Sequence, residues 1–424
     1  MQSPIPNAFW SNLFQGVVAT TTTLALVSMY REKRNAGVEP IAPALKELRS
    51  RELDYDTAAG ALSDILDALE AEARAKKGVV KLAVRERGIA SLLVKMLKFD
   101  ADAVDESARI CSIVFKIVGR AFSDDATGRD AWAAAGGHKK LLSLVSVAHR
   151  DGHTKLMEEA AQALREVCVV DEDEMNLPVD VPAGSKGALE LATYPATQKM
   201  LRVLSKSART PFLVQIAAVF ASICTLRAGG LFLSKGIDNK SGAAIFLDLI
   251  DPRGNQLLSE YCVRTIHWMS IHDKEIHHEL AEASNVAKIV DLLEPMQTTN
   301  TVHSLLGLVA SLSHHGASKA FLTEFMAANG PTALIRLWCK ADEKETRDRA
   351  ETIVRILSRH PIATDEIGRL LEMHRSMLME RRARDEEVQR KAQMQQRQQQ
   401  MMQQQMMMQM AQSGQLPPGM MDEE

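Results

Sequence analysis

The sequence predicts an all-α protein built as a solenoid of repeated helical units. Two observations carry this prediction. An apolar pattern recurs six times at intervals of 43 to 59 residues, close to the spacing of about 40–47 residues found in repeats of two or three helices. Only 4% of the residues are aromatic, whereas the strands of β-sandwiches and barrels favour Phe, Tyr and Trp.

Each unit begins with a small or polar residue, and apolar residues follow at the fourth, fifth, seventh and eighth positions after it; the one exception is Lys95, at the seventh position of the first unit. These offsets lie on one face of an α-helix. The six starting residues are Gly88, Gly137, Ala196, Gly242, Asn285 and Gly330. A second apolar helix is expected about 15–20 residues after each start. Stacked units of this kind bury a continuous core that no single unit could bury alone.

Three of these segments, GIASLLVKML, GHKKLLSLVS and GPTALIRLWC, resemble the third helix of armadillo repeats. The resemblance covers residues 53–370, where residues 53–74 are expected to form a capping pair of helices. It implies an armadillo/HEAT-like α-solenoid with a long concave binding surface. The helices expected to line the groove contain no Asn. They therefore lack the ladder of Asn and Trp with which armadillo proteins read nuclear localisation signals.

The first thirty residues contain no charged side chain. We predict a short segment at residues 1–12 and a transmembrane signal anchor at residues 13–30, which leads into a linker at residues 31–52. As a helix, residues 8–30 would extend roughly 34 Å, enough for a hydrocarbon core about 30 Å thick. The residues expected to act in anchoring are the aromatic residues at the two ends, the basic residues that follow and two small residues on one face: Trp10, Tyr30, Arg31, Lys33, Arg34, Gly16 and Thr20.

Basic residues prefer the cytosolic side of a membrane, so residues after Arg31 are expected to face the cytosol. The four consecutive threonines at residues 20–23 make the segment only moderately hydrophobic, a pattern typical of anchors in the mitochondrial outer membrane. The alternative is a buried or disordered N-terminal segment without a membrane role.

No sequence motif indicates catalysis, a cofactor or a metal. The chain has no GxxxxGK[ST], HExxH or GxSxG motif, and these motifs mark phosphate loops, zinc proteases and serine hydrolases respectively. In the cluster His267, His272, His277 and His278, the first three histidines are five residues apart, which places them about 140° apart on a helix rather than on one face. The five cysteines lie in apolar runs and are expected to be buried thiols. We therefore predict that the protein is not an enzyme and holds no metal or cofactor.

The chain carries 51 Lys and Arg against 54 Asp and Glu, a formal net charge of -3. This near balance excludes a strongly basic nucleic-acid binder, so no nucleic acid is expected among the partners. Recognition of a charged partner must then depend on local clusters.

Two sets of residues are candidates for binding cargo. The first is an acidic run inside an inserted loop at residues 169–187, which is expected to attract basic peptides: Asp171, Glu172, Asp173 and Glu174. The second set occupies the sixth position of the repeat template, which points away from the apolar face. There Arg202, Asp248 and Asp291 are expected to face the groove and contact a basic amphipathic helix. For both sets the alternative is an ordinary solvated surface.

The C-terminal part changes in composition. Residues 371–392 are charged and are expected to extend the last helix into solvent. Residues 393–424 are rich in Gln and Met. Such a low-complexity segment cannot form a packed core, so we predict a disordered tail there. Its flexible Met side chains suit loose contacts with varied apolar partners.

A short signal anchor, a cytosolic armadillo domain and a mass of 46.8 kDa together resemble the armadillo-domain receptor subunits of the archaic translocase of the outer mitochondrial membrane in trypanosomatids. The resemblance implies a single-pass receptor in that membrane. It would bind mitochondrial precursor proteins on the cytosolic side and pass them to the import translocase, with other translocase subunits as partners. The alternative is an armadillo-type scaffold or co-chaperone without a membrane anchor.

Overall fold

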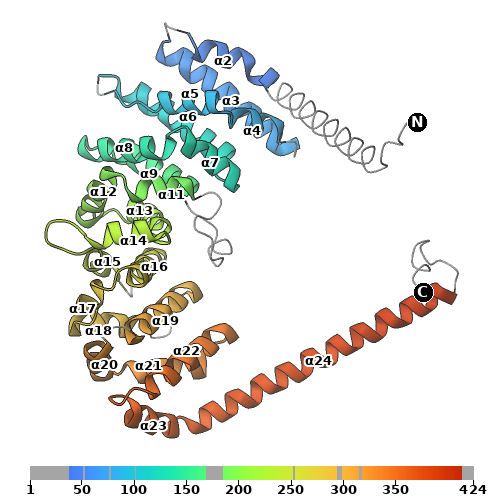
Figure 1. Cartoon of the computed structure of the whole chain (residues 1–424). Helices are drawn as coiled ribbons and strands as arrows, with labels where there is room; N and C mark the ends of the chain where they lie inside the picture. The colour runs from blue at the N-terminus through green and yellow to red at the C-terminus, as the bar shows by residue number, and fades with distance from the viewer. Residues whose placement is uncertain are drawn as a thin grey trace, which may run out of the picture.

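The computed structural model describes residues 38–50, 53–75, 78–100, 102–168, 185–251, 254–293, 298–314 and 318–412. Over these ranges the chain folds into a crescent of stacked helices (Figure 1). The predicted all-α solenoid is therefore confirmed.

Six repeats of three helices make up the central part of the described chain. Each has a short first helix, a second helix that begins at or near the template start, and a longer third helix. The repeats are α4 (Val79–Val84), α5 (Arg87–Met96) and α6 (Val104–Phe122); α7 (Ala126–Ala134), α8 (Gly137–Arg150) and α9 (Thr154–Cys168); α11 (Lys186–Ala192), α12 (Pro195–Lys206) and α13 (Thr210–Cys224); α14 (Arg227–Ser234), α15 (Gly242–Leu249) and α16 (Gln256–His272); α17 (Ile276–Leu280), α18 (Ala283–Leu292) and α19 (Thr299–His314); and α20 (Ser318–Ala327), α21 (Gly330–Lys340) and α22 (Lys344–Ser358).

The segments compared with third helices of armadillo repeats are in fact the second helices α5, α8 and α21. The sequence-based assignment was wrong because the first helices contain only 5 to 10 residues. Such short helices show no clear periodicity.

The small residue at the template start has a packing role. A Cβ atom at Gly137 would lie 2.0 Å from the Trp132 ring of α7, and one at Gly330 would lie 2.4 Å from the Phe325 ring of α20. Each aromatic residue of the first helix thus packs directly on the start of the second helix. No larger side chain fits there without displacing the ring.

The repeats are preceded by a short 3-10 helix η1 (Glu39–Ile41), α2 (Ala42–Leu48) and α3 (Tyr55–Ala75). The linker prediction for residues 31–52 is wrong over this part, because Ile41, Leu45 and Leu48 are buried and α2 packs on α3. These three residues have the i, i+4, i+7 spacing of one helical face. Residues 53–74 are not a helix pair; they lie almost entirely in α3, whose partner in the cap is α2.

The repeats are followed by α23 (Thr364–Met373) and α24 (Arg375–Gln412), a helix of 38 residues. The tail predicted to be disordered from residue 393 is helical as far as Gln412. Gln and Met are good helix formers, and neither Gly nor Pro occurs between Arg375 and Gln412 to stop the helix. Residues 413–424 lie outside the described residues.

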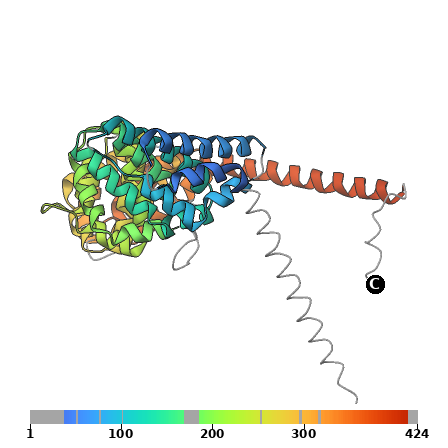
Figure 2. The same cartoon turned by 90° about the horizontal axis from the view of Figure 1, so that it is seen from above.

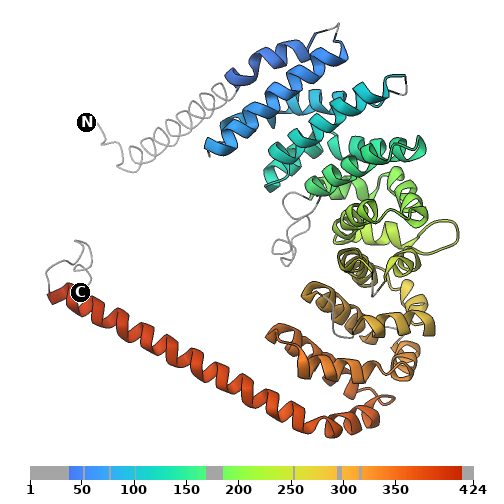
Figure 3. The same cartoon turned by 180° about the vertical axis from the view of Figure 1, so that it is seen from behind.

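The third helices form the core of the crescent. Together with α3 they pack one on the next in this order: α3, α6, α9, α13, α16, α19 and α22. In Figures 1 and 3, α16, α19 and α22 lie on the side of the crescent that faces α24, whereas α15, α18 and α20 lie on the opposite side. We call these the inner and outer sides. Because α13 has neighbours all round, every residue from Phe212 to Cys224 except Gln215 is buried.

The segment predicted to be a membrane anchor lies in residues 1–37, outside the described residues. This range includes all seven residues proposed for anchoring: Trp10, Gly16, Thr20, Tyr30, Arg31, Lys33 and Arg34. Within the described ranges, no helix combines the length and the apolar character needed to cross a membrane.

Candidate functional site

Two adjoining hollows lie on the third helices at the N-terminal end of the crescent. The larger has a volume of about 780 Å³ and is lined by α3, α6 and α9. The smaller has a volume of about 650 Å³ and lies between the first turns of α6 and α9. Ser112, Lys116, Lys155 and Glu159 line both hollows. Together the hollows form one continuous groove, which we call the α6–α9 groove.

Charges of both signs line the larger hollow. The acidic residues are Glu70 of α3 with Glu159 and Glu166 of α9, and the basic residues are Lys116 and Arg120 of α6 with Lys155 of α9. The lining therefore has equal numbers of acidic and basic side chains. The floor adds apolar surface from Leu66, Phe115 and Ala163. Such a lining suits a partner segment that presents both apolar and charged side chains.

Two carboxylates of α9 are held in place at the wall of the groove. The Ser112 hydroxyl donates a hydrogen bond to Glu159. Gln162 Nε2 donates one to Glu166 Oε1 at 3.0 Å. A Cβ atom at Gly119 would lie 2.6 Å from Glu166 Oε2, so the glycine on α6 leaves the space that this carboxylate occupies. The two glutamates are seven residues apart and thus lie on the same face of α9.

A polar contact crosses the crescent next to this groove. Arg165 Nη1 of α9 donates to Gln215 Oε1 of α13 at 3.1 Å, and Arg165 Nη2 donates to the Tyr261 hydroxyl of α16 at 3.0 Å. The guanidinium carbon also lies 5.6 Å from the Tyr261 ring centroid. Because α13 lies between α9 and α16, this contact must pass over α13. We call it the Arg165 bridge, and it links the three successive third helices α9, α13 and α16.

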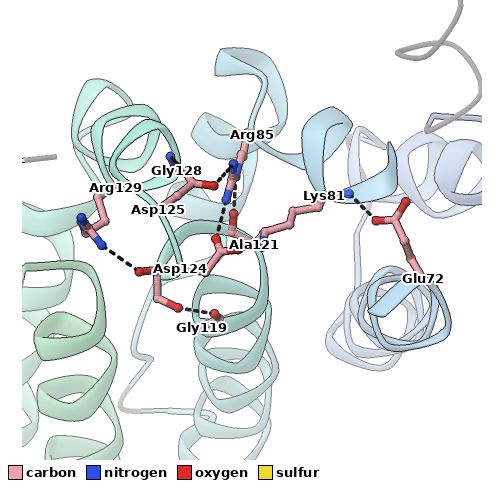
Figure 4. A network of polar contacts seen from close by, with 10 residues as sticks. Glu72, Lys81, Arg85, Gly119, Ala121, Asp124, Asp125, Gly128 and Arg129 are labelled. Atoms are coloured by element: carbon pink, nitrogen blue, oxygen red, sulfur yellow. Dashed lines mark hydrogen bonds and ion pairs between the residues drawn. The ribbon is translucent and has the colours of Figure 1, made fainter. Parts of the chain in front are cut away.

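A second polar network lies at the C-terminal ends of α3, α4 and α6 (Figure 4). Glu72 of α3 accepts hydrogen bonds from the first N–H groups of α4, at 2.6 and 2.9 Å. Arg85, just after α4, forms ion pairs with Asp124 at 2.6 Å and Asp125 at 2.9 Å and donates to the Ala121 carbonyl at the end of α6. The network thereby ties α3 and α4 to the end of α6.

The histidines of α16 and α17 occupy separate positions. His272 Nε2 lies 3.2 Å from the Thr225 carbonyl, and His277 Nε2 lies 2.7 Å from the Ser270 carbonyl. His267 stacks with Trp268, and its ring fills the space beside Gly307 of α19. Burial lowers the pKa of His267 to about 4, so its imidazole is neutral near pH 7. These rings do not converge on one point.

Within the ranges that the structure describes, one group brings three possible metal ligands close together: His303, Glu343 and Glu345, with ligand atoms within 4.8 Å of one another. Protein partners already surround it. His303 Nε2 lies 2.9 Å from Thr346 Oγ1, and Arg349 donates to Glu345 Oε1 at 3.1 and 2.6 Å. Hydrogen bonds and an ion pair thus explain this arrangement without an ion.

The candidate cargo residues chosen from the repeat template lie on second helices: Arg202 on α12, Asp248 on α15 and Asp291 on α18. All three are exposed, as expected. The prediction that these residues face the groove was wrong. The repeat template marks the second helices, which lie on the outer side, and not the third helices on the inner side. Arg202 pairs with Asp238 at 2.6 Å, and Asp248 pairs with Lys240 and with Lys288. The acidic run Asp171, Glu172, Asp173 and Glu174 lies outside the described residues.

The residues of the α6–α9 groove were missed at the sequence level. One signal was present: Lys155, Glu159, Gln162 and Glu166 follow the i, i+4, i+7, i+11 spacing of one polar face on α9. That spacing is equally typical of any solvated helix face. Only the packing of α9 beside α6 and α3 distinguishes the groove from such a face.

No family model matches the sequence, and no curated protein matches it. Solved structures do. A chain from the structure described as "A conserved phosphorylation switch controls the interaction between cadherin and beta-catenin in vitro and in vivo" is 13% identical, with a TM-score of 0.54, and the match covers 72% of this chain and 59% of that one.

Two designed proteins also match, a designed armadillo repeat protein and a computationally designed one for modular peptide recognition. They are 15% and 14% identical, with TM-scores of 0.49 and 0.48, and each match covers 63% of this chain and 99% of the other. Identities this low bear on the fold and not on the activity. The repeats of three helices, together with the likeness at a TM-score of 0.54, show that this chain has an armadillo-type fold.

Proposed function

We propose that this protein is a peptide-binding scaffold and that the α6–α9 groove holds a segment of its partner. The observation that carries the proposal is the continuity of the two hollows, of about 780 and 650 Å³, across neighbouring third helices. Solenoids bind through such extended inner surfaces. The described groove offers carboxylates, ammonium and guanidinium groups and an apolar floor. This lining suits a peptide that carries both charged and apolar side chains.

A finer proposal concerns the partner: a mitochondrial precursor protein, bound by a receptor in the outer membrane that passes it to the import translocase. The support is the uncharged N-terminal segment followed by basic residues, together with the armadillo-type fold. In this proposal a basic amphipathic presequence places its apolar face on Leu66 and Phe115. Its basic side chains pair with Glu159 and Glu166, two helical turns apart.

Fluorescence anisotropy measures the binding of a labelled presequence peptide to the full chain. This experiment tests both the scaffold proposal and the finer presequence proposal. The double variant Glu159→Gln with Glu166→Gln keeps the size of both side chains and removes both charges. We expect about tenfold weaker binding, because two partly exposed ion pairs together contribute roughly 1–1.5 kcal/mol.

The matched control is Asp248→Asn with Asp291→Asn on the outer side, which removes two charges from α15 and α18. We expect unchanged binding. Loss of binding in this control but not in the groove variant would move the site to the outer side of the crescent. A precursor segment without a presequence separates the two levels: if it binds the groove equally well, the scaffold proposal stands and presequence selectivity does not.

Membrane attachment is tested separately. Alkaline carbonate extraction of membranes that contain the full chain should leave a single-pass protein in the pellet. Release into the supernatant would favour the alternative, an armadillo-type scaffold or co-chaperone without an anchor.

A further inference from the structure

The open face of α16 carries an apolar row at the centre of the crescent. α16 contacts α13 on one side, α19 on the other, and α14 and α15 behind it, so its remaining face lies on the inner side of the crescent (Figures 1 and 3). The row advances in alternating steps of four and three residues, which keeps it on one face of the helix: Leu257, Tyr261, Arg264, Trp268 and Ile271. We call this set the central row.

Burial separates the central row from the other faces of α16. Leu257 is 41% exposed and Ile271 is 44% exposed, and the three members between them are half-buried. Apart from Gln256 at the first position and two flanking histidines, all other residues of α16 are buried. The neighbouring α13 and α19 have no such row, because their residues that are not buried are polar or small, apart from Pro211. Four large apolar or aromatic side chains are thus concentrated on one third helix.

Neighbouring side chains hold the two aromatic rings of the row in place. The Trp268 ring stacks with His267, with centroids 5.7 Å apart, and with His272, with centroids 6.1 Å apart. The Tyr261 hydroxyl accepts a hydrogen bond from Arg165 in the Arg165 bridge. Rings that are already fixed lose little conformational freedom on binding, and aromatic side chains are common anchors of interfaces.

The charge at the central row is positive. α13 and α19 contain no Asp or Glu. The acid of α16, Glu260, is buried and accepts hydrogen bonds from two side chains at the start of α19. The guanidinium groups of Arg165 and Arg264 lie at the row, and the hydrogen-bond partners of Arg165 are a neutral amide and a neutral hydroxyl. These guanidinium groups therefore favour carboxylates supplied by a partner.

α24 lies on the same side of the crescent but packs elsewhere. It contacts α21 and α23, and beyond Asp385 every side chain that the structure describes is exposed. Seen from above, this helix extends away from the stacked repeats (Figure 2). The exposed members of the central row are thus accessible to a partner.

We propose that the central row binds an acidic amphipathic helix of a partner protein, aligned along α16. The row covers residues 257–271, about 21 Å at 1.5 Å per residue. A helix laid along α16 contacts the whole row. An extended segment that crosses the third helices meets the row at one place and then reaches the polar surfaces of α13 and α19. Carboxylates beside the apolar face of the partner helix pair with Arg165 and Arg264. This inference does not depend on what the α6–α9 groove binds.

Fluorescence anisotropy with the full chain tests the proposal. The probe is a designed helix of about 18 residues, or roughly 27 Å, with Leu and Met on one face and Glu, Gln and Ala elsewhere. The variant Leu257→Glu with Ile271→Glu places two charges on the row and should weaken binding at least tenfold. The matched control is Leu189→Glu with Leu231→Glu on α11 and α14, where each leucine is 37% exposed. It should bind like the wild type.

Two results would overturn the proposal. The first is a wild type that does not bind the acidic probe at about 100 μM. The second is a control that loses binding as strongly as the row variant does, because the loss would then not be specific to the central row.

The charge preference is tested with Arg165→Gln, which removes one guanidinium charge and keeps an N–H donor for the Tyr261 hydroxyl. We expect about three- to fivefold weaker binding of the acidic probe, because one partly exposed ion pair is lost. A second probe with Lys in place of each Glu should bind this variant at least as tightly as it binds the wild type. Equal losses for the two probes would refute the preference for an acidic partner.

Disulfide trapping tests the alignment along α16. A probe with cysteine at its first position should form a disulfide with only one of two variants, Leu257→Cys and Ile271→Cys. A probe with cysteine at its last position should form a disulfide with the other. The five native cysteines are all buried and should contribute little background. Equal trapping of both probes by both variants would refute the alignment.

The competing occupant is the acidic run of this chain at residues 171–174. A variant in which these four acids are changed to Asn and Gln should bind the acidic probe as the wild type does. Binding that appears only in this variant would show that the chain's own acidic run occupies the central row, and the partner proposal would be wrong.

Discussion

At the scale of single residues, the missing side chain of a glycine determines several contacts between repeats. Gly187 of α11 lies against His138 of α8, where an added Cβ atom would be 2.1 Å from the imidazole Nε2. His138 is fully buried, and the same nitrogen lies 2.9 Å from the Val167 carbonyl. The imidazole is therefore fixed between one repeat and the next, and Gly187 provides the room for it.

We predict that Gly187→Ala lowers the free energy of unfolding by about 1–3 kcal/mol, because the buried imidazole must shift to admit the methyl group. The control is Gly60→Ala on α3, where nothing lies within 4 Å of the new atom. That substitution should stabilise the protein by about 0.5–1 kcal/mol through helix propensity. Urea denaturation of both variants measures the difference, and equal effects would contradict this account of Gly187.

The buried histidines predict acid sensitivity. Burial lowers the pKa of His138, like that of His267, to about 4, whereas an unfolded His titrates near 6.5. The unfolded chain therefore binds more protons between these values. The contribution of these two histidines to the free energy of unfolding is fully present above about pH 6.5. It falls as the pH drops towards 4, with a slope of about 1.4 kcal/mol per pH unit for each histidine. Below pH 4 these two residues add no further loss.

The variant His138→Gln removes one of these titrations and keeps an N–H donor for the Val167 carbonyl. Urea midpoints measured at several pH values between 7 and 4 should decline less steeply for this variant than for the wild type. The remaining slope comes in part from His267. Parallel curves for the two proteins would show that His138 does not titrate in this range on unfolding.

At the scale of elements, the sequence predicts best where a helix is both amphipathic and long enough to show its period. The second and third helices meet this condition, and both were predicted from their apolar spacing. The first helices were missed because 5 to 10 residues give fewer than three turns. For the same reason the buried α2, with seven residues, was assigned to a linker.

The groove shows where reasoning from one sequence ends. The polar face of α9 has a clear period, but its neighbours are set by packing between helices that are about 40 residues apart in the chain. Lys116 of α6 and Glu159 of α9 line the same groove only because the repeats stack. The helical tail was missed for another reason: low complexity indicates that no core can form, yet it does not exclude a helix of good helix formers.

The reassignment of α2 can be tested directly. Leu48 is 2% exposed, so we predict that Leu48→Ala lowers the free energy of unfolding by about 2–4 kcal/mol, as deletion of a buried leucine does in other cores. Lys46→Ala on the exposed face of the same helix should change stability by less than about 0.5 kcal/mol. A thermal or urea denaturation series on these two variants decides whether this segment belongs to the solenoid or is a linker.

At the scale of the whole molecule, the crescent depends on contacts between neighbouring repeats, so local stability should vary along it. α13 is buried between α9 and α16, whereas α23 lies near the C-terminal end of the crescent. We predict the slowest amide exchange in α13 and α16 and the fastest in α24 beyond Asp385. Hydrogen exchange followed by mass spectrometry gives this profile, and equally fast exchange in α13 and α24 would contradict it.

Mechanical load on the crescent would act unequally on its two sides. Straightening the crescent from its ends stretches the inner side, where the Arg165 bridge links α9, α13 and α16. Bending it further stretches the outer side, where Arg202 holds Asp238 and Lys288 holds Asp248 through exposed ion pairs. Exposed pairs resist extension weakly, whereas the bridge combines two hydrogen bonds with a cation–π contact. The centre of the crescent therefore yields more readily to tightening around a bound segment than to being forced open by one.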